Sequence, residues 1–557
     1  MAFIVKKKIN GKEYYYLNET KRINGKVKTK TLAYLDKSKK EAEKKAKEII
    51  KNLNKNKKEV IQDKISEMEK KDITINELSV FCKRKGFVYQ SGEIYGGLAG
   101  FWDFGHLGVE LKNNIKKEWW NYHVYQRDDV VGIDGSIITH PKVWEASGHV
   151  GNFNDFFVVC KNCKKPGKIA QNEFGKIKCE CGGEYDIANA KKFDLMFKTN
   201  VGESGEAFLR PETAQLIFSN FKSVYENARM KLPFGIAQSG KAFRNEIAPR
   251  DFLFRSREFE QMELQFFVDP NKINDYPYYN KIEKYKIKIL TASAQEDKGE
   301  ESFLSISEMV EKGIFKNKWH AYWLYNSYKW FLDLGIDEKN LRLREHRKDE
   351  LSHYAKSAVD IEYKFSFGWK EIFGSHDRGQ FDLGEHEKFS KKDMKVLDEE
   401  TGEKILPNVI EASFGVERAF LVFMSDSYFY DKARENIILK LNPKLSPIKA
   451  AVFPIVKKKE FEKLSEEIVA ELKKEFNVVY DKSGSIGRRY ARNDEAGTPY
   501  CITIDDESLI KKNVTVRWRD TGEQVRIKIK DLKDSLRKSI DGESILNLGK
   551  LVNTRKK

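Results

Sequence analysis

The chain has 557 residues, of which 40% are hydrophobic, and a formal net charge of +17. This length gives room for about two to four domains with well-buried cores. The sequence contains no apolar run long enough to span a bilayer and no secretory signal pattern at Met1, which argues against a membrane or secreted protein. Its six cysteines include two close pairs rather than a disulfide framework. We therefore expect a cytoplasmic protein with no membrane partner.

The positive charge is concentrated at the N-terminus. Residues 1–58 hold 19 Lys and Arg against 6 Asp and Glu, a net charge of +13, which leaves +4 for the other residues. Such a block usually engages nucleic acid or another polyanion through its phosphates. The alternative is a solubilising tail, and the lysine-rich composition of the whole chain keeps that alternative open.

Residues 1–58 are predicted to form a basic appendix of sheet plus helix. Residues 3–5, 14–17 and 27–35 read as three antiparallel strands around two hairpin turns, Asn10-Gly11 and Asn24-Gly25. A helix is expected from Ser38 to Asn52, with Ser38 as N-cap and Glu41 at capping-box spacing. Residues 59–74 are assigned as a linker.

The rest of the chain divides into two predicted regions. Residues 75–440 form a central region with a cysteine-bearing insertion at 160–181 and a charged, aromatic, mostly helical insertion at 270–340. Two prolines between 441 and 447 mark a boundary. Beyond it, strands at 450–456 and 477–480 flank an amphipathic helix at 460–475, so residues 441–557 are predicted to be a small α/β domain.

Two stretches place charged side chains on one face of a sheet. In a strand from residue 240 to 246 that face would carry Gly240, Ala242, Arg244 and Glu246. The returning segment carries, at one parity, Arg255, Arg257, Phe259, Gln261 and Glu263. Charges beside small residues suit a floor for a polyanionic ligand, since the arginine fork binds phosphate in two places. The alternative is a solvated hairpin with surface ion pairs.

Residues 409–418 predict a strand followed by a helix. Glu411 and Ser413 would share one face of the strand. Gly415 would permit a tight turn, and Arg418 would fall in the first turn of the helix. The alternative for Arg418 is an ion pair with a surface acid.

Four cysteines have spacings that are typical of a metal site. Cys160 and Cys163 form one pair, and Cys179 and Cys181 form another after 15 intervening residues. Such pairs in a Gly- and Lys-rich insertion resemble a zinc ribbon or knuckle, which would hold a structural Zn²⁺; four free thiols are the alternative. Cys82 and Cys501 stand alone in apolar contexts and are predicted to be ordinary core residues.

These motifs resemble those of a known family. The stretch 240–263 resembles motif 2 of the class II aminoacyl-tRNA synthetases, residues 409–418 resemble motif 3, and residues 133–149, with Pro141, resemble motif 1. The apolar run and central proline of residues 133–149 favour a buried, bent element. The segments 93–108, 208–215 and 368–383 are similar to glycyl-tRNA synthetase sequences. Residues 484–500 resemble the anticodon-binding domain that the glycine, threonine, proline and histidine enzymes share. The resemblance covers residues from about 75 to about 545.

The resemblance implies an α+β catalytic domain built on an antiparallel sheet with flanking helices, a C-terminal α/β anticodon-binding domain and the extra N-terminal appendix. It implies an enzyme that joins glycine and ATP into glycyl-adenylate and pyrophosphate and then loads tRNA(Gly). Mg²⁺ would accompany ATP, motif 1 would build a homodimer interface, and positioning and charge stabilisation would carry the reaction.

The resemblance also implies a role for each matching residue. Arg244 and Arg418 would be the catalytic arginines. ATP would contact Arg244, Glu246, Arg255, Phe259, Glu371, Arg378 and Arg418. Glycine would be bound by Glu212, Glu263, Glu411 and Ser413. Three carboxylates around one small cation are costly until that cation binds, which favours an ammonium ligand. The alternative is that some of these glutamates are tied to Arg210 or Arg244.

Two other functions remain open. One is a non-catalytic, nucleic-acid-binding accessory protein, but such a protein would be expected to lose Arg244, Glu246, Arg255 and Arg418. The other is a class IIa synthetase of threonine or proline specificity, against which the acidic residues argue. In the C-terminal domain, residues 517–519 (Arg-Trp-Arg) form a further candidate contact with RNA. For residues 1–58 we hypothesise an extra tRNA contact.

Overall fold

The structure is a computed structural model. It describes residues 2–9, 12–23, 26–36, 38–46, 49, 68–169, 174–203, 205–297, 299–352, 354–398 and 401–552. The two predicted Asn-Gly turns, the last residues of the predicted N-terminal helix and most of the predicted linker 59–74 lie outside these ranges. The chain forms two compact units. One contains Met1–Lys70, Phe429–Asn436 and Asp520–Gly522, and the other contains the remaining residues.

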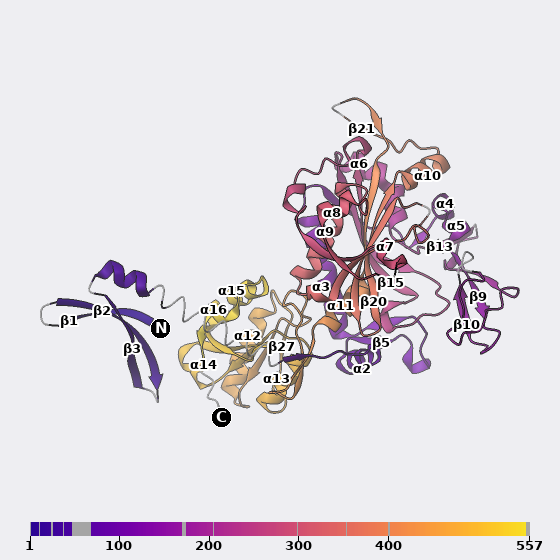
Figure 1. Cartoon of the computed structure of the whole chain (residues 1–557). Helices are drawn as coiled ribbons and strands as arrows, with labels where there is room; N and C mark the ends of the chain where they lie inside the picture. Colours follow the sequence, from indigo (N-terminus) through magenta and orange to yellow (C-terminus); the bar gives the residue numbers. More distant parts are fainter. Residues whose placement is uncertain are drawn as a thin grey trace. The chain divides into compact units, whose positions relative to one another are not determined.

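The first unit contains a three-stranded antiparallel sheet, as the sequence predicts. Its strands are β1 (Ala2–Ile9), β2 (Lys12–Ile23) and β3 (Lys26–Asp36), in the order β1-β2-β3. Residues 39–46 are helical and lie along one side of this sheet (Figure 1). The small core between helix and sheet is formed by Tyr15, Leu17, Leu35, Ala42 and Ala46. In the same unit β4 (Met68–Lys70) pairs antiparallel with the last three residues of β24 (Tyr428–Asp431).

The second unit is built on a nine-stranded sheet of order β17-β16-β18-β19-β20-β23-β15-β14-β7. Most neighbours are antiparallel, whereas the pairs β14–β7 and β16–β18 are parallel, so the sheet is mixed rather than purely antiparallel. The strands are β7 (Val130–Ile133), β14 (Phe234–Phe243), β15 (Glu258–Val268), β16 (Lys286–Leu290), β17 (Ser302–Ser305), β18 (Leu341–Glu345), β19 (Ser357–Phe365), β20 (Gly368–Gly379) and β23 (Asn408–Gly415).

Helices cover both faces of this sheet (Figure 1). Because strand side chains alternate, Phe266 belongs to a core with α3 (His106–Trp120), α9 (Lys318–Asp333) and α11 (Val416–Asp426). Its neighbour Phe267 packs on the other face with α6 (Ala214–Ala228) and α10 (Phe381–Ser390). The sheet is therefore fixed from both sides, and its polar residues are held on a rigid platform.

Shorter elements connect these layers. They are α2 (Ile75–Lys85), β5 (Val88–Gln90), η1 (Glu93–Tyr95), β6 (Trp102–Phe104), η2 (Asn121–Tyr125), β8 (Ile138–Thr139), α4 (Pro141–Ala146), α5 (His149–Asn152), β9 (Asn154–Val159), β10 (Pro166–Ile169), β11 (Lys191–Asp194), β12 (Lys198–Val201), β13 (Gly205–Leu209), η4 (Phe252–Phe254), η5 (Pro270–Lys272), η6 (Tyr279–Lys281), α7 (Ala292–Glu296), α8 (Ile306–Glu311), η7 (Glu338–Asn340), β21 (Val396–Leu397), β22 (Lys404–Ile405) and β25 (Asn436–Leu439).

Two expectations about this region are wrong in part. The segment 270–340 is not simply a helical insertion, because β16 and β17 extend the central sheet and α9 packs in its core. The segment 133–149 is not a buried, bent element. Ile137 and Ile138 are exposed there, and Pro141 begins the short helix α4, where its missing N–H costs nothing.

The C-terminal region has the predicted α/β character. Its sheet has the order β27-β26-β28-β29-β30-β31, with β26 parallel to β27 and β28 and the later pairs antiparallel. The elements are β26 (Ala450–Pro454), α12 (Lys459–Leu472), β27 (Val478–Tyr480), α13 (Ile486–Glu495), β28 (Tyr500–Ile504), α14 (Asp506–Lys511), β29 (Asn513–Trp518), β30 (Gln524–Lys528), α15 (Ile529–Ile540), α16 (Ile545–Leu548) and β31 (Lys550–Leu551). Among the helices that the structure describes, none has the length and apolar character needed to cross a membrane.

Candidate active site

A cavity of about 400 Å³ opens on the central sheet. Its walls come from β15, β20 and β23, from the chain after β14 and from the first turn of α11. Ten of the residues predicted to bind ATP or glycine line it: Glu212, Arg244, Glu246, Arg255, Phe259, Glu263, Glu371, Glu411, Ser413 and Arg418. The structure thus brings together residues that lie more than 200 positions apart in the sequence.

The hairpin β14–β15 has the predicted alternation. Gly240 lies opposite Gln261 and Ala242 opposite Phe259, so these side chains share one face. β14 ends at Phe243, earlier than predicted, although the N–H of Arg244 still donates to the carbonyl of Arg257 at 2.8 Å. The arginine therefore emerges at the end of the strand.

Arg244 is fixed between backbone and aromatic rings. Its Nε donates to the carbonyl of Pro211 at 3.0 Å, and its guanidinium carbon lies 5.3 Å from the ring centre of Phe259 and 5.5 Å from that of Phe153. Such stacking favours the cation and restricts its rotamers. Glu246 does not pair with Arg244. It accepts from Arg255, with Nε at 2.9 Å and Nη2 at 2.8 Å.

Glu263 lies among neutral donors. Ser413 Oγ donates to one of its oxygens at 2.9 Å, and the backbone N–H of Thr213 donates to the other at 3.1 Å. Burial, reinforced by the charges of Glu411 and Glu212, raises the pKa of Glu263 to about 7. Near neutral pH this carboxyl is therefore poised between its two protonation states.

The other two glutamates have histidine or arginine partners. Burial alone would raise the pKa of Glu212, but His149, whose Nε2 lies 3.3 Å from the carboxylate, holds it at about 2. Burial also opposes ionisation of Glu411, yet Arg378 at 2.8 Å and His376 at 3.1 Å hold the pKa of Glu411 well below its usual range. Neither is tied to Arg210 or Arg244, which was the alternative from the sequence.

Arg378 does not line the cavity. It is 2% exposed and makes two bonds of 2.8 Å to Asp382 as well as the bond to Glu411. Its guanidinium carbon also lies 3.7 Å from the centre of the Tyr354 ring. This geometry does not favour the predicted contact with ATP phosphates, because the donors already have carboxylate partners. It makes Arg378 a buried support for Glu411.

Motif 3 has the predicted strand-to-helix form. In β23, Glu411 lies opposite Gln265 and Ser413 opposite Glu263, so both face the cavity. Arg418, in the first turn of α11, pairs with Glu371 at 2.8 Å and lies 4.6 Å from the ring centre of Phe254. Gly415 has φ −87°, a conformation open to any residue, so the turn does not require glycine there.

Several contacts in and beside the cavity were not predicted from the sequence. His149 lies against Glu212, His376 lies against Glu411, and the Tyr354 ring stacks on Arg378. Gln261, which was predicted only to share the strand face of Glu263, donates to Glu263 at 3.1 Å. For His376 a signal existed, since it lies directly opposite Glu411 on neighbouring strands. His149 begins the short helix α5 and Tyr354 lies in a turn, and no local pattern in the sequence predicts that either residue lies beside the glutamates.

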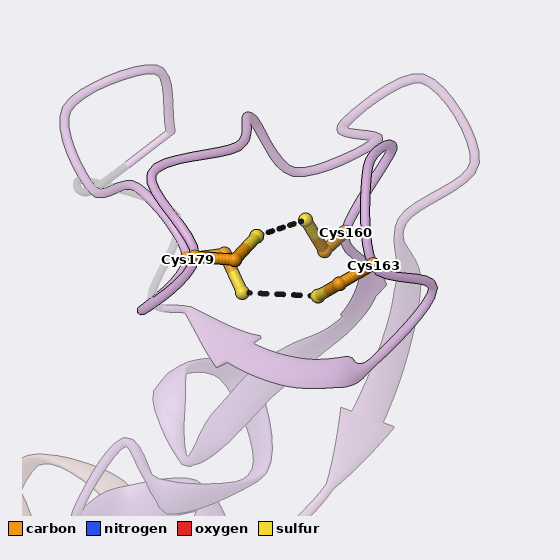
Figure 2. A group of neighbouring side chains, drawn as sticks. Cys160, Cys163 and Cys179 are labelled. Atoms are coloured by element: carbon orange, nitrogen blue, oxygen red, sulfur yellow. Dashed lines mark hydrogen bonds between the residues drawn. The ribbon is translucent and has the colours of Figure 1, made fainter.

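The four cysteines of the insertion converge on one point. Their sulfur atoms all lie within 4.8 Å of one another, with Cys160 Sγ 3.6 Å from Cys181 Sγ and Cys163 Sγ 3.6 Å from Cys179 Sγ (Figure 2). Cys160 follows β9 in the small sheet β10-β9-β11. The backbone N–H of Cys163 stabilises the Cys160 thiolate and lowers the pKa of Cys160 to about 6. Four sulfurs this close can hold a metal ion.

In the C-terminal domain the predicted RNA contact at residues 517–519 is wrong for both arginines. Arg517 is buried and makes two bonds, of 2.7 and 2.8 Å, to Asp494. Arg519 is 1% exposed and donates to the carbonyls of Gly497 and Leu441. Both stabilise the domain from inside. Arg488 and Arg492, on α13, are the exposed cations of the neighbouring motif.

Comparisons with known proteins identify the domains of this chain. Residues 197–427 match the model of the "tRNA synthetase class II core domain (G, H, P, S and T)", and residues 449–539 match that of the "Anticodon binding domain". The protein therefore has a class II synthetase core followed by an anticodon-binding domain.

Similar proteins indicate which class II synthetase family the chain belongs to. The chain is 44% identical to the glycine–tRNA ligase of Borrelia hermsii over 84% of its own length and 98% of the relative. The enzymes of Geobacillus thermodenitrificans and Thermobifida fusca are 44% and 41% identical, over 85% of this chain and 100% of each relative. The chain belongs to the glycine–tRNA ligase family of aminoacyl-tRNA synthetases.

Proposed function

We propose that this protein activates glycine with ATP to glycyl-adenylate and transfers the glycyl group to the 3′ end of tRNA(Gly). The observation that carries this proposal is a cavity that combines the carboxylates of the buried Glu263 and Glu411 and the partly buried Glu212 with the arginines of motifs 2 and 3. Carboxylates select an ammonium, and arginines select phosphates. A site for glycine and ATP needs both.

Each side chain has a role in this proposal. Glu212, Glu263 and Glu411 hold the ammonium of glycine, with Ser413 fixing Glu263. Adenine stacks on Phe259, and the Glu246–Arg255 pair borders the nucleotide. Arg244 contacts the α-phosphate and Arg418 the γ-phosphate, where they stabilise the charge that develops as the glycine carboxylate attacks. Glu371 would exchange its contact with Arg418 for one with the Mg²⁺-bound triphosphate.

Arg378 does not contact a substrate in this proposal. It fixes the position of Glu411 through their hydrogen bond.

The proposal includes three features of the whole protein. The cysteine cluster holds a structural Zn²⁺, since four cysteine sulfurs within 4.8 Å of one another suit that ion. The protein works in the cytoplasm as a homodimer, as the resemblance implies. Residues 75–440 would be the catalytic domain and residues 441–557 the anticodon-binding domain.

Amino-acid-dependent exchange of pyrophosphate into ATP, without tRNA, tests the proposal. We expect exchange with glycine and with no other standard amino acid. Exchange with threonine or proline would keep the fold but overturn the roles of Glu212, Glu263 and Glu411. No exchange from folded protein with Mg²⁺ would favour a non-catalytic RNA-binding protein.

A further inference from the structure

The three-stranded sheet of the first unit has one face covered by the helix at residues 39–46 and one face turned away from it. Leu17 and Leu35 are buried under the helix. Because side chains alternate along a strand, the neighbouring residues Tyr16 and Tyr34 lie on the opposite face. Tyr16 on β2 lies directly opposite Tyr34 on β3. Lys7 on β1 lies directly opposite Tyr14 on β2.

These four residues, Lys7, Tyr14, Tyr16 and Tyr34, form what we call the tyrosine face. The ring centres of Tyr16 and Tyr34 are 5.4 Å apart, and those of Tyr14 and Tyr34 are 6.3 Å apart. The Nζ of Lys7 lies 5.2 Å from the centre of the Tyr16 ring. Tyr34 is 50% exposed and Tyr14 and Tyr16 are half-buried, so the rings remain open to a ligand.

Stabilising the sheet does not fully explain this arrangement. Cross-strand aromatic pairs do stabilise sheets, yet the unit already has its own core on the helix side. The exposed ring of Tyr34 and the partly exposed rings of Tyr14 and Tyr16 together leave apolar surface in water. It sits in a segment whose net charge is +13 over residues 1–58. Flat rings inside a strongly positive segment match a ligand with both aromatic surface and negative charge.

We propose that the tyrosine face binds single-stranded RNA, with unpaired bases stacking on the rings of Tyr14, Tyr16 and Tyr34 while Lys7 and neighbouring cations contact phosphates. Bases in a duplex are already stacked on one another, whereas unpaired bases can be laid onto an aromatic sheet. The choice of RNA rests on the proposed function, because the substrate of a tRNA ligase carries unpaired bases in its loops and at its 3′ end.

The test is the binding of a labelled single-stranded RNA of about 12 nucleotides to the full-length chain, followed by fluorescence anisotropy. The variant Y16L/Y34L keeps apolar bulk but removes two rings, and we expect its Kd to rise about tenfold or more. The variant Y16F/Y34F keeps the rings and should bind within about twofold of the wild type. The matched control is Y125L, which removes a tyrosine that is 77% exposed in the second unit.

Salt dependence separates stacking from charge. Y16L/Y34L should leave the slope of log Kd against log salt unchanged, whereas K7Q should reduce it by about 0.7. Wild-type binding by Y16L/Y34L would overturn the proposal, as would tighter binding of duplex RNA or of single-stranded DNA of the same sequence. If the double variant does not fold, Y34L alone, which changes a half-exposed residue, replaces it in the binding measurement.

Glycine-dependent exchange is measured on each variant and should match the wild type, because the candidate site lies in the other unit. Absence of glycine-dependent exchange in the wild-type protein would contradict the proposed function. Loss of RNA binding only in Y16L/Y34L, with exchange retained, would support the tyrosine face.

Discussion

Among the glutamates of the cavity, Glu263 differs from its two neighbours. Glu212 and Glu411 each have a histidine or arginine within 3.3 Å, whereas the hydrogen-bond donors described for Glu263 are neutral. In the free protein a proton can therefore take the place that the ammonium of glycine would take in the proposed complex. A buried carboxyl held in this way becomes acidic only when a cation arrives.

The first prediction is that glycine binding releases a proton and tightens as the pH rises through 7. Below the Glu263 pKa of about 7 the carboxyl is neutral, and the affinity for glycine should fall by up to about tenfold per pH unit. The KM for glycine in the exchange reaction, measured from about pH 5.5 to about pH 8.5, checks this. E263Q should bind glycine weakly and lose the dependence. A flat profile in the wild type would contradict the prediction.

The same shift has a consequence for stability. The folded pKa of Glu263 lies above the ordinary value of 4.5, so the folded state binds the proton more tightly than the unfolded state does. Its contribution to stability is fully present below about pH 4.5 and is lost as the pH rises through 7. Glycine should therefore stabilise the protein most at neutral pH and above.

The second prediction concerns Arg378, which the structure places behind Glu411 rather than in the cavity. R378K keeps one charge but cannot bridge Glu411 and Asp382 through a planar fork. We expect the KM for glycine to rise about tenfold while the KM for ATP stays within about twofold. In the comparison variant R418K, the KM for ATP should rise instead. A raised KM for ATP in R378K would restore the phosphate contact predicted from the sequence.

At the scale of elements, β14 shows how a backbone position serves the site. A Cβ at Gly240 would collide with the guanidinium of Arg210, which is 1% exposed and donates to the carbonyls of Lys241 and Gly135. The absence of a side chain at Gly240 lets that buried arginine cross the strand. It joins β14 to the segment before β8.

The third prediction follows from this contact. G240A should destabilise the protein by about 1–3 kcal/mol, because Arg210 must leave its carbonyl partners or the strand must shift. The control G205A adds a methyl group at a strand position with open space around it. A lower midpoint of thermal unfolding for G240A, with G205A unchanged, is the expected result. Equal midpoints would show that Arg210 moves away at little cost.

The fourth prediction concerns the cysteine cluster. The purified protein should contain one zinc ion per chain, and C160S/C163S should contain none. Loss of the ion should expose the insertion at 160–181 to proteases, since four ligands then no longer join its loops. Elemental analysis and limited proteolysis measure the two effects. C82A, which alters a buried cysteine outside the cluster, should keep its zinc.

The elements that the sequence could predict are those with strong local signals. Alternation placed Gly240, Ala242, Glu411 and Ser413 on the correct faces, and cysteine spacing located the cluster. Sheet order is set by pairing between distant segments, so β16 and β17 could be read as part of a helical insertion. Charge alone also cannot distinguish a ligand-binding arginine from a buried one, which is why Arg517 and Arg519 were predicted at the surface. The burial of Arg378, whose contact with ATP was implied by the resemblance, has no local signal either.

At the scale of the whole molecule, the basic segment of residues 1–58 can be considered apart from the region that carries the candidate site. The curated relatives are matched over 96% or more of their own lengths but over only 83 to 85% of this chain. All residues that line the candidate site lie between 212 and 418. The excess charge of +13 lies in residues 1–58, far from that range in the sequence. Activation of glycine should therefore not depend on this segment.

The fifth prediction is that a chain of residues 59–557 retains glycine-dependent exchange within about twofold of the full-length rate but binds tRNA about tenfold more weakly at low salt. Each cation removed from the contact with tRNA makes the tRNA affinity less dependent on salt. The affinities of the full-length chain and of residues 59–557 should therefore become equal as the salt concentration increases. Exchange and binding titrations at several salt concentrations check both parts. Unchanged tRNA affinity at every salt concentration would mean that residues 1–58 only raise solubility, and that the positive charge of this protein serves no nucleic acid.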